Sequence, residues 1–227
     1  MRKPSYPNSG ISPALVRIIP FAIYLAFLAI VPWIETYFPD GRWLYPAKVA
    51  CVAVALGLLW PQFDELRDSW RSIGRDWWLA LAIGVAIFIL WINLDQPWAS
   101  IGESTGYDPR KATGEIDYPL AAIRLAGASL IVPVMEELFW RSFIMRWIEQ
   151  KEFRSLAPRA VTWYGLLVSS VLFGFEHNLW LAGILAGLAY AFLYIRSGNL
   201  WIPIIAHAVT NFLLGCWVLY SGNWQFW

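Results

Sequence analysis

The sequence predicts an all-α fold, a polytopic membrane helix bundle with about seven transmembrane helices. Hydrophobic residues make up 59% of the 227-residue chain and charged residues only 15%, and the mean hydropathy is +0.50. Both fractions lie far from those of soluble domains. No stretch between the apolar runs is long enough for a second folded unit. We therefore expect residues 1–227 to form a single membrane domain.

Seven apolar runs approach the ~20 residues that a membrane-spanning helix requires. They are residues 15–34, 47–61, 77–94, 119–145, 160–176, 181–196 and 201–220. The first follows basic residues, as a signal peptide would, but VPWIETYFPD comes after it instead of a small-residue cleavage site. We interpret it as an uncleaved span. Residues 1–118 then hold three spans, and residues 119–220 hold a core with the candidate catalytic motifs.

The distribution of basic residues predicts the orientation of these spans. With a cytoplasmic N-terminus, eleven lie in cytoplasmic segments: Arg2, Lys3, Arg17, Arg67, Arg71, Arg75, Arg146, Lys151, Arg154, Arg159 and Arg196. Four lie in outer segments: Arg42, Lys48, Arg110 and Lys111. Basic residues near short loops stay cytoplasmic, so we expect the N-terminus inside and the C-terminus outside. The lipid bilayer is the expected environment, and no nucleic acid is an expected partner.

Two other patterns have structural explanations. Residues 96–118 form the longest connection, rich in Gly, Pro and acidic residues, which we interpret as an outer tether although loops of this length sometimes act as lids. Gly183 and Gly187 have the small-xxx-small spacing of closely packed membrane helices.

Ionisable residues inside spans are costly and usually face a cavity or a partner. In the stretch EELFWR, Glu137 and Arg141 are four residues apart on one helical face, whereas Glu136 points about 100° away. Arg141 can therefore neutralise Glu137 and leave Glu136 to face something else.

Two further clusters hold the only two histidines of the chain. Phe173 and His177 share a face in FGFEHN, and His207 and Asn211 share a face in HAVTN. Singly, each cluster is also explained as a hydrogen-bond partner between helices. Jointly, a carboxylate, two imidazoles and an amide are the parts of a site that activates water for hydrolysis.

The motifs EExxxR, FxxxH and HxxxN, in this order on separate helices, resemble those of the CAAX protease and bacteriocin-processing family of intramembrane proteases. The resemblance covers about residues 119–220, and the ending GNLWIPIIAHAVTNF is similar to a bacterial branch associated with exosortases. It implies that Glu136 and His177 hold and deprotonate a water, while His207 and Asn211 stabilise the oxyanion. Glu137 and Arg141 would form a structural ion pair, and Phe173 would support the site.

The same resemblance implies a membrane-associated protein or peptide substrate and a location in a bacterial inner membrane. The cofactor stays open between none and one divalent metal such as zinc, held by Glu136, His177 and His207, because one Glu and two His also form a zinc site. Asn211 fits an oxyanion donor better than a zinc ligand, which favours the metal-free mechanism. The alternatives are a non-catalytic scaffold or immunity-type protein and a small proton-coupled transporter, although no hydropathy repeat supports the transporter.

The depths of the motifs disagree if every span crosses fully. Glu136 lies about 27 Å along the fourth span and His177 about 25 Å along the fifth, which runs the opposite way. We therefore expect residues 119–127 to form an outer piece of the fourth span. We also expect the fifth span to end inside the membrane at a water-filled chamber.

Overall fold

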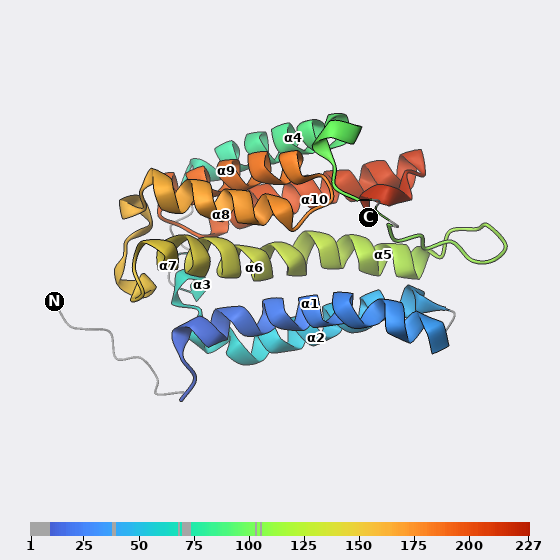
Figure 1. Ribbon diagram of the computed structural model, residues 1–227, viewed down its shortest axis with the longest axis horizontal. Coiled ribbons are helices and arrows are strands. Elements are labelled where there is room, and N and C mark those ends of the chain that lie inside the picture. The colour runs from blue at the N-terminus through green and yellow to red at the C-terminus, as the bar shows by residue number, and fades with distance from the viewer. Residues whose placement is uncertain (1–9, 38–39, 68, 70–73, 103, 105) are drawn as a thin grey trace.

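The computed structural model is a bundle of helices that run along a common long axis (Figure 1). It describes residues 10–37, 40–67, 69, 74–102, 104 and 106–227, and these contain no β-strand, which confirms the predicted all-α class. The α-helices are α1 (Pro13–Tyr37), α2 (Leu44–Leu59), α3 (Asp64–Arg67), α4 (Asp76–Asn93), α5 (Tyr118–Ala126), α6 (Val132–Glu137), α7 (Met145–Glu149), α8 (Trp163–Phe175), α9 (Trp180–Ser197) and α10 (Trp201–Ser221).

All seven predicted spans are helical, and in the described part of the chain six helices are long and apolar enough to cross a membrane. The six are Pro13–Val31, Gly41–Gln62, Asp76–Asn93, Tyr118–Glu149, Trp180–Ser197 and Trp201–Ser221. The exception is α8, whose 13 residues extend about 20 Å against a hydrocarbon thickness of ~30 Å. The protein is a multi-pass membrane protein with one short helix inside the bundle.

Local contacts explain why α8 is short. Its N-terminus is capped by Glu149, whose Oε1 accepts hydrogen bonds from the backbone N–H groups of Thr162 (2.9 Å) and Gly165 (3.1 Å). A carboxylate at this position also complements the helix dipole. The helix ends at Phe175, and Glu176 and His177 follow directly. A helix of this length agrees with the expectation that the fifth span stops inside the membrane, which stays a prediction.

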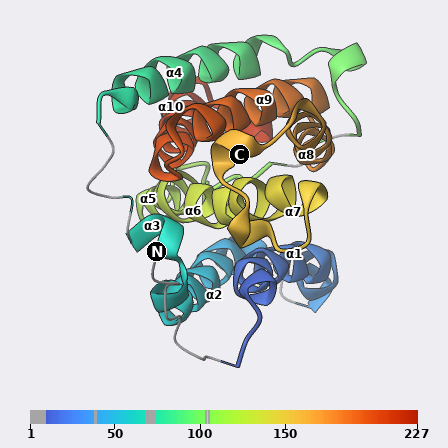
Figure 2. The same ribbon diagram turned by 90° about the vertical axis from the view of Figure 1, so that its left-hand side faces the viewer.

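The fourth span occupies the centre of the bundle. Figure 2 shows α5, α6 and α7 in line between the α1–α2 pair on one side and α8, α9 and α10 on the other, with α4 outermost. The fourth span is continuous over 32 residues, longer than one crossing requires. The surplus lets its middle, where Glu136 lies, face the end of α8.

Glycines allow α8 and α9 to approach closely. A Cβ at Gly187 would lie 2.9 Å from Cα of Ser170, and one at Gly183 would lie 2.9 Å from Cα of Gly174. Both distances are too short for a side chain, so the predicted packing role of Gly183 and Gly187 is confirmed.

A buried polar network joins three elements at the end of the bundle where α1 begins. Arg17, only 1% exposed, pairs with Glu65 of α3 at 2.6 Å. The Nε of Arg17 also donates to the hydroxyl of Ser142 at 3.1 Å, and this hydroxyl donates to Glu65. The network fixes α1 and α3 against the central helix.

Candidate active site

Two π-helical segments, Gly127–Ile131 and Leu138–Ile144, flank α6, which carries the glutamate pair. In the first, the N–H of Val132 donates to the carbonyl of Gly127, five residues back. The next donor in this register would be Pro133, which has no N–H. The carbonyl of Ala128 instead accepts a hydrogen bond from Nδ2 of Asn211 at 2.9 Å. A proline on the central helix thus creates the acceptor that positions Asn211.

Glu137 has two partners where the sequence suggested one. Its Oε1 lies 3.0 Å from Nη1 of Arg141 and 3.1 Å from Nδ1 of His207. Glu137 and Arg141 are 0% and 2% exposed, and the guanidinium stacks on the Phe173 ring at 4.3 Å. Because Nδ1 of His207 faces this carboxylate, the imidazole is held with its Nε2 directed away from Glu137.

Glu136 faces the other nitrogen of the same imidazole. Its Oε2 lies 3.8 Å from Nε2 of His207, beyond hydrogen-bonding distance, and has no hydrogen-bond partner among the described residues. Its residue is 5% exposed. A buried carboxylate oxygen without a protein partner requires water or a ligand. The separation of Glu136 from an imidazole is well below the roughly 10 Å that would have excluded general-base chemistry.

His177 is oriented by its own helix. Its Nδ1 lies 2.9 Å from the carbonyl oxygen of Phe173, so Nδ1 carries the proton and donates it. The neutral ring then has a free lone pair on Nε2. The rings of Phe173 and Trp91 pack against the imidazole at 4.8 and 5.3 Å between centroids. Phe173 therefore supports both His177 and, through its ring, Arg141.

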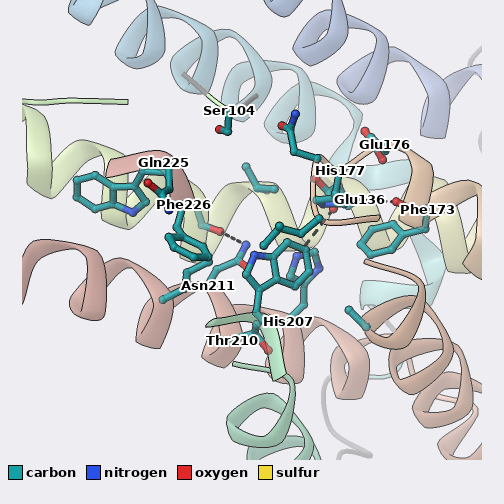
Figure 3. Close-up of a pocket in the computed structure, with 18 of the residues that line it drawn as sticks. Ser104, Glu136, Phe173, Glu176, His177, His207, Thr210, Asn211, Gln225 and Phe226 are labelled. Atoms are coloured by element: carbon teal, nitrogen blue, oxygen red, sulfur yellow. Dashed lines mark hydrogen bonds and ion pairs between the residues drawn. The ribbon is translucent and has the colours of Figure 1, made fainter. Parts of the chain in front are cut away.

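These side chains line one cavity of about 580 Å³. Figure 3 shows Glu136 of α6, His177 of the turn after α8 and His207 of α10 around it, with Asn211 and Phe226 further along. Ser100, Gly102 and Ser104 of the long connection also line the cavity. This connection is joined to the turn after His177, since the N–H of Ile101 donates to the carbonyl of Asn178 at 2.8 Å. It is part of the cavity wall, which corrects its interpretation as a plain tether.

The sequence analysis did not single out Glu176 and Tyr190, which also line the cavity. Glu176 accepts a hydrogen bond from Nε1 of Trp140 at 3.0 Å, and Tyr190 stacks on His207 at 4.9 Å between ring centroids. The signal for Glu176 was present in FGFEHN, as a third carboxylate at the end of an apolar run. Tyr190 gave no signal, because an aromatic residue in a span is ordinary.

The charges at the centre of the site do not balance without a proton. Glu136 and Glu137 are two carboxylates, and Arg141 is the one guanidinium beside them. A net negative charge in a buried site is costly. One proton, on Nε2 of His207 or on Glu136, makes the group neutral. The arrangement can therefore move a proton between an imidazole and a carboxylate.

The three side chains suggested as metal ligands, Glu136, His177 and His207, line one cavity. No group of three His, Cys, Asp or Glu side chains in the described part of the chain is arranged as a metal-binding cluster. Nδ1 of His177 and Nδ1 of His207 are engaged with Phe173 and Glu137, which leaves both Nε2 atoms and Glu136 as the donors that an ion would use. Two donors that each lie about 2.0 to 2.2 Å from one zinc ion are roughly 3.3 to 4 Å apart, so the 3.8 Å between Glu136 and His207 does not exclude an ion.

Fold and site together define a multi-pass membrane protein with a buried acid–base centre at a cavity. Residues 118–213 match the family described as Type II CAAX prenyl endopeptidase Rce1-like. This segment includes the glutamate pair, both histidines and Asn211. This match supports the resemblance of the chain to the CAAX protease family.

One curated relative is similar over most of the chain. It is named "Putative membrane peptidase YdiL", from Bacillus subtilis (strain 168), and is 28% identical over 179 residues, which cover 76% of this chain and 69% of the relative. No solved structure matches the chain significantly.

Proposed function

We propose that this protein is an intramembrane endopeptidase that hydrolyses a peptide bond of a membrane-associated protein. The observation that carries the proposal is the unpartnered Oε2 of Glu136, held in a buried cavity next to His207. A carboxylate in this position can take a proton from water, because the site neutralises Glu137 separately through Arg141.

In the proposed mechanism a water bound at Glu136 attacks the peptide carbonyl carbon while its proton passes to Glu136. The lone pair of Nε2 of His177 accepts a hydrogen bond from the same water. The tetrahedral intermediate then collapses, the C–N bond breaks, and the proton on Glu136 passes to the leaving nitrogen. The charge on the intermediate develops on the former carbonyl oxygen, where fixed donors are most effective.

His207 and Asn211 are the proposed donors to this oxyanion. Protonated His207, held by Glu137 through Nδ1, would donate from Nε2. Asn211 uses one N–H for the carbonyl of Ala128, and an amide nitrogen has a second to donate. The proposed mechanism requires no metal.

The proposal includes a bacterial inner-membrane location with a cytoplasmic N-terminus. Its support is the bias of basic residues: α3 and α7, which carry Arg67 and Arg146, lie at the end of the bundle where α1 begins (Figure 1). Membership of the exosortase-associated branch stays a prediction from the sequence ending.

Comparison of membrane proteomes tests the proposal. Cells with the wild-type protein, Glu136→Gln or Glu115→Gln are compared for membrane proteins that accumulate uncleaved. Glu115 is an exposed loop carboxylate, so its substitution controls for loss of a negative charge. We expect accumulation only with Glu136→Gln, at wild-type levels of folded protein. Identical proteomes with all three would refute proteolysis and favour the scaffold alternative.

A further inference from the structure

Two basic side chains near the cavity have no acidic partner. Lys48 of α2 is 6% exposed, and no ion pair joins it to a carboxylate among the described residues. Arg124 of α5 lines the cavity, and its buried Nε has no hydrogen-bond partner. Lys48 is a buried and unpaired charge, which is costly, and Arg124 is a half-buried one that opens on the cavity.

Aromatic rings hold both cations in one place. Nζ of Lys48 lies 4.0 Å from the centroid of Tyr24 and 5.1 Å from that of Tyr45. Cζ of Arg124 lies 4.3 Å from the same Tyr45 ring. Tyr24 lines the cavity together with Arg124. The rings position the charges but offer much weaker compensation than an anion would.

The acidic groups of the cavity do not pair with Arg124. Asp95 accepts a hydrogen bond from Nε2 of Gln225 at 3.0 Å, and Glu176 accepts one from Trp140 at 3.0 Å. Oε2 of Glu136 lies 3.8 Å from Nε2 of His207. None of the three forms an ion pair with Arg124 among the described residues, although all share its cavity. In the described part of the chain, Arg124 and Lys48 are therefore available to an anion that the protein does not supply.

We infer that Arg124, assisted by Lys48, forms a subsite for a carboxylate of the peptide substrate. This deepens the proposed function and rests on it. The carboxylate is either the C-terminus of the substrate or an acidic side chain, and both would pair with the guanidinium in the same way. A peptide carboxylate is favoured over a lipid phosphate because Arg124 opens on the cavity that contains Glu136.

The helix sets the spacing between the subsite and the proposed scissile bond. Arg124 precedes Glu136 by twelve residues on the same continuous helix, which is about 18 Å at 1.5 Å per residue. An extended peptide covers this distance with about five residues, at roughly 3.3 to 3.6 Å each. The bound carboxylate therefore lies about five residues from the bond that is cleaved.

Binding of defined peptides to the full chain in nanodiscs of neutral phosphatidylcholine tests the subsite. The probes are an N-terminally labelled peptide, Leu-Ala-Val-Leu-Ala-Leu, as free acid and as amide, and an amide in which Glu replaces the last residue. Fluorescence anisotropy measures their affinity. We expect the free acid to bind about ten-fold or more tightly than the apolar amide, the effect of one charge-assisted contact.

Arg124→Gln should reduce this preference to below about three-fold, whereas Arg124→Lys should keep part of it. Lys111→Gln, which removes an exposed charge from the outer loop, should leave it unchanged. Because Arg124 has no acidic partner, Arg124→Gln should unfold no more easily than the wild type. The Glu-containing amide shows whether a side chain can replace the terminus.

Equal binding of acid and amide, or a preference that survives Arg124→Gln, would overturn the inference. So would the absence of binding by every probe up to about 1 mM, the weak end of the affinity scale. Retention of phosphatidylglycerol that depends on Arg124, without a preference among peptides, would assign the cations to a lipid phosphate instead. The same measurements with Glu136→Gln separate this outcome from a failure of the proposed catalysis, since binding requires no cleavage.

Discussion

Glu136 and Glu137 are adjacent in sequence, but we predict that the same change at each has opposite effects. Glu137→Gln leaves Arg141 without its carboxylate at 3.0 Å and His207 without the charge at 3.1 Å. Arg141 retains only a 3.4 Å contact with the carbonyl of Gly187 and the ring of Phe173. Removing one partner of a buried ion pair costs about 3 to 5 kcal/mol. The lower value is expected here, because glutamine can still accept a hydrogen bond.

Glu136→Gln removes no hydrogen bond of Oε2 and eliminates an unbalanced charge. Its free energy of unfolding should therefore stay within about 1 kcal/mol of the wild type. A loss of 3 kcal/mol at Glu137 corresponds to a change of roughly 100-fold in the unfolding equilibrium constant. Glu136→Gln should abolish proteolysis while the protein remains as stable as before.

The assay is reversible unfolding of the purified protein in mixed micelles with increasing SDS, followed by tryptophan fluorescence. Glu115→Gln, in an exposed loop, is the control for the loss of one carboxylate. The double variant Glu137→Gln/Arg141→Gln should lose less stability than the two single variants added together. Equal destabilisation by Glu136→Gln and Glu137→Gln, or strict additivity of the double variant, would refute this division of roles.

Four further predictions follow from the packing and the polar contacts. Gly187→Ala should destabilise the protein by about 1 to 3 kcal/mol, because the added methyl group overpacks the contact between α8 and α9. Gly57→Ala is the control, since a Cβ at Gly57 meets open space. Equal effects of the two changes in the micelle assay would contradict the α8–α9 packing. Asn211→Ala should lower the free energy of unfolding by about 1 to 3 kcal/mol, because it leaves the carbonyl of Ala128 without a hydrogen bond. Adding Pro133→Ala should restore this stability by supplying an N–H to that carbonyl, but it should not restore proteolysis. Burial alone would raise the pKa of Glu65, but its ion pair with Arg17 and its hydrogen bonds hold that pKa below the ordinary value of 4.5. The carboxylate therefore stabilises the folded protein above pH 4.5, and this stabilisation is lost as the pH falls through the lowered pKa. In Glu65→Gln the free energy of unfolding should change less between pH 6 and pH 3.5 than it does in the wild type. Proteolysis should survive EDTA, and elemental analysis should find no stoichiometric zinc; loss of activity that zinc restores would refute the metal-free mechanism.

Regular helical geometry was a good guide to the ion pair and an incomplete guide to its surroundings. The four-residue spacing brought Glu137 and Arg141 together, as expected from one face of a helix. The π-helical segment that begins at Leu138 and the contact of Glu137 with His207 were not predictable from spacing. The contact depends on a helix 70 residues further along the chain.

The composition and periodicity of the sequence determined the membrane environment, the helical class and the identity of the polar groups that require a partner. These properties are local, because a span must satisfy its own backbone hydrogen bonds and must be apolar wherever it meets lipid. The tertiary structure alone decided that His177 lines the same cavity as Glu136, since this depends on where Glu149 caps α8 and where α8 ends. It also decided that Arg124 and Lys48 lie near one ring and form no ion pair among the described residues, because burial and pairing arise only when distant helices pack together.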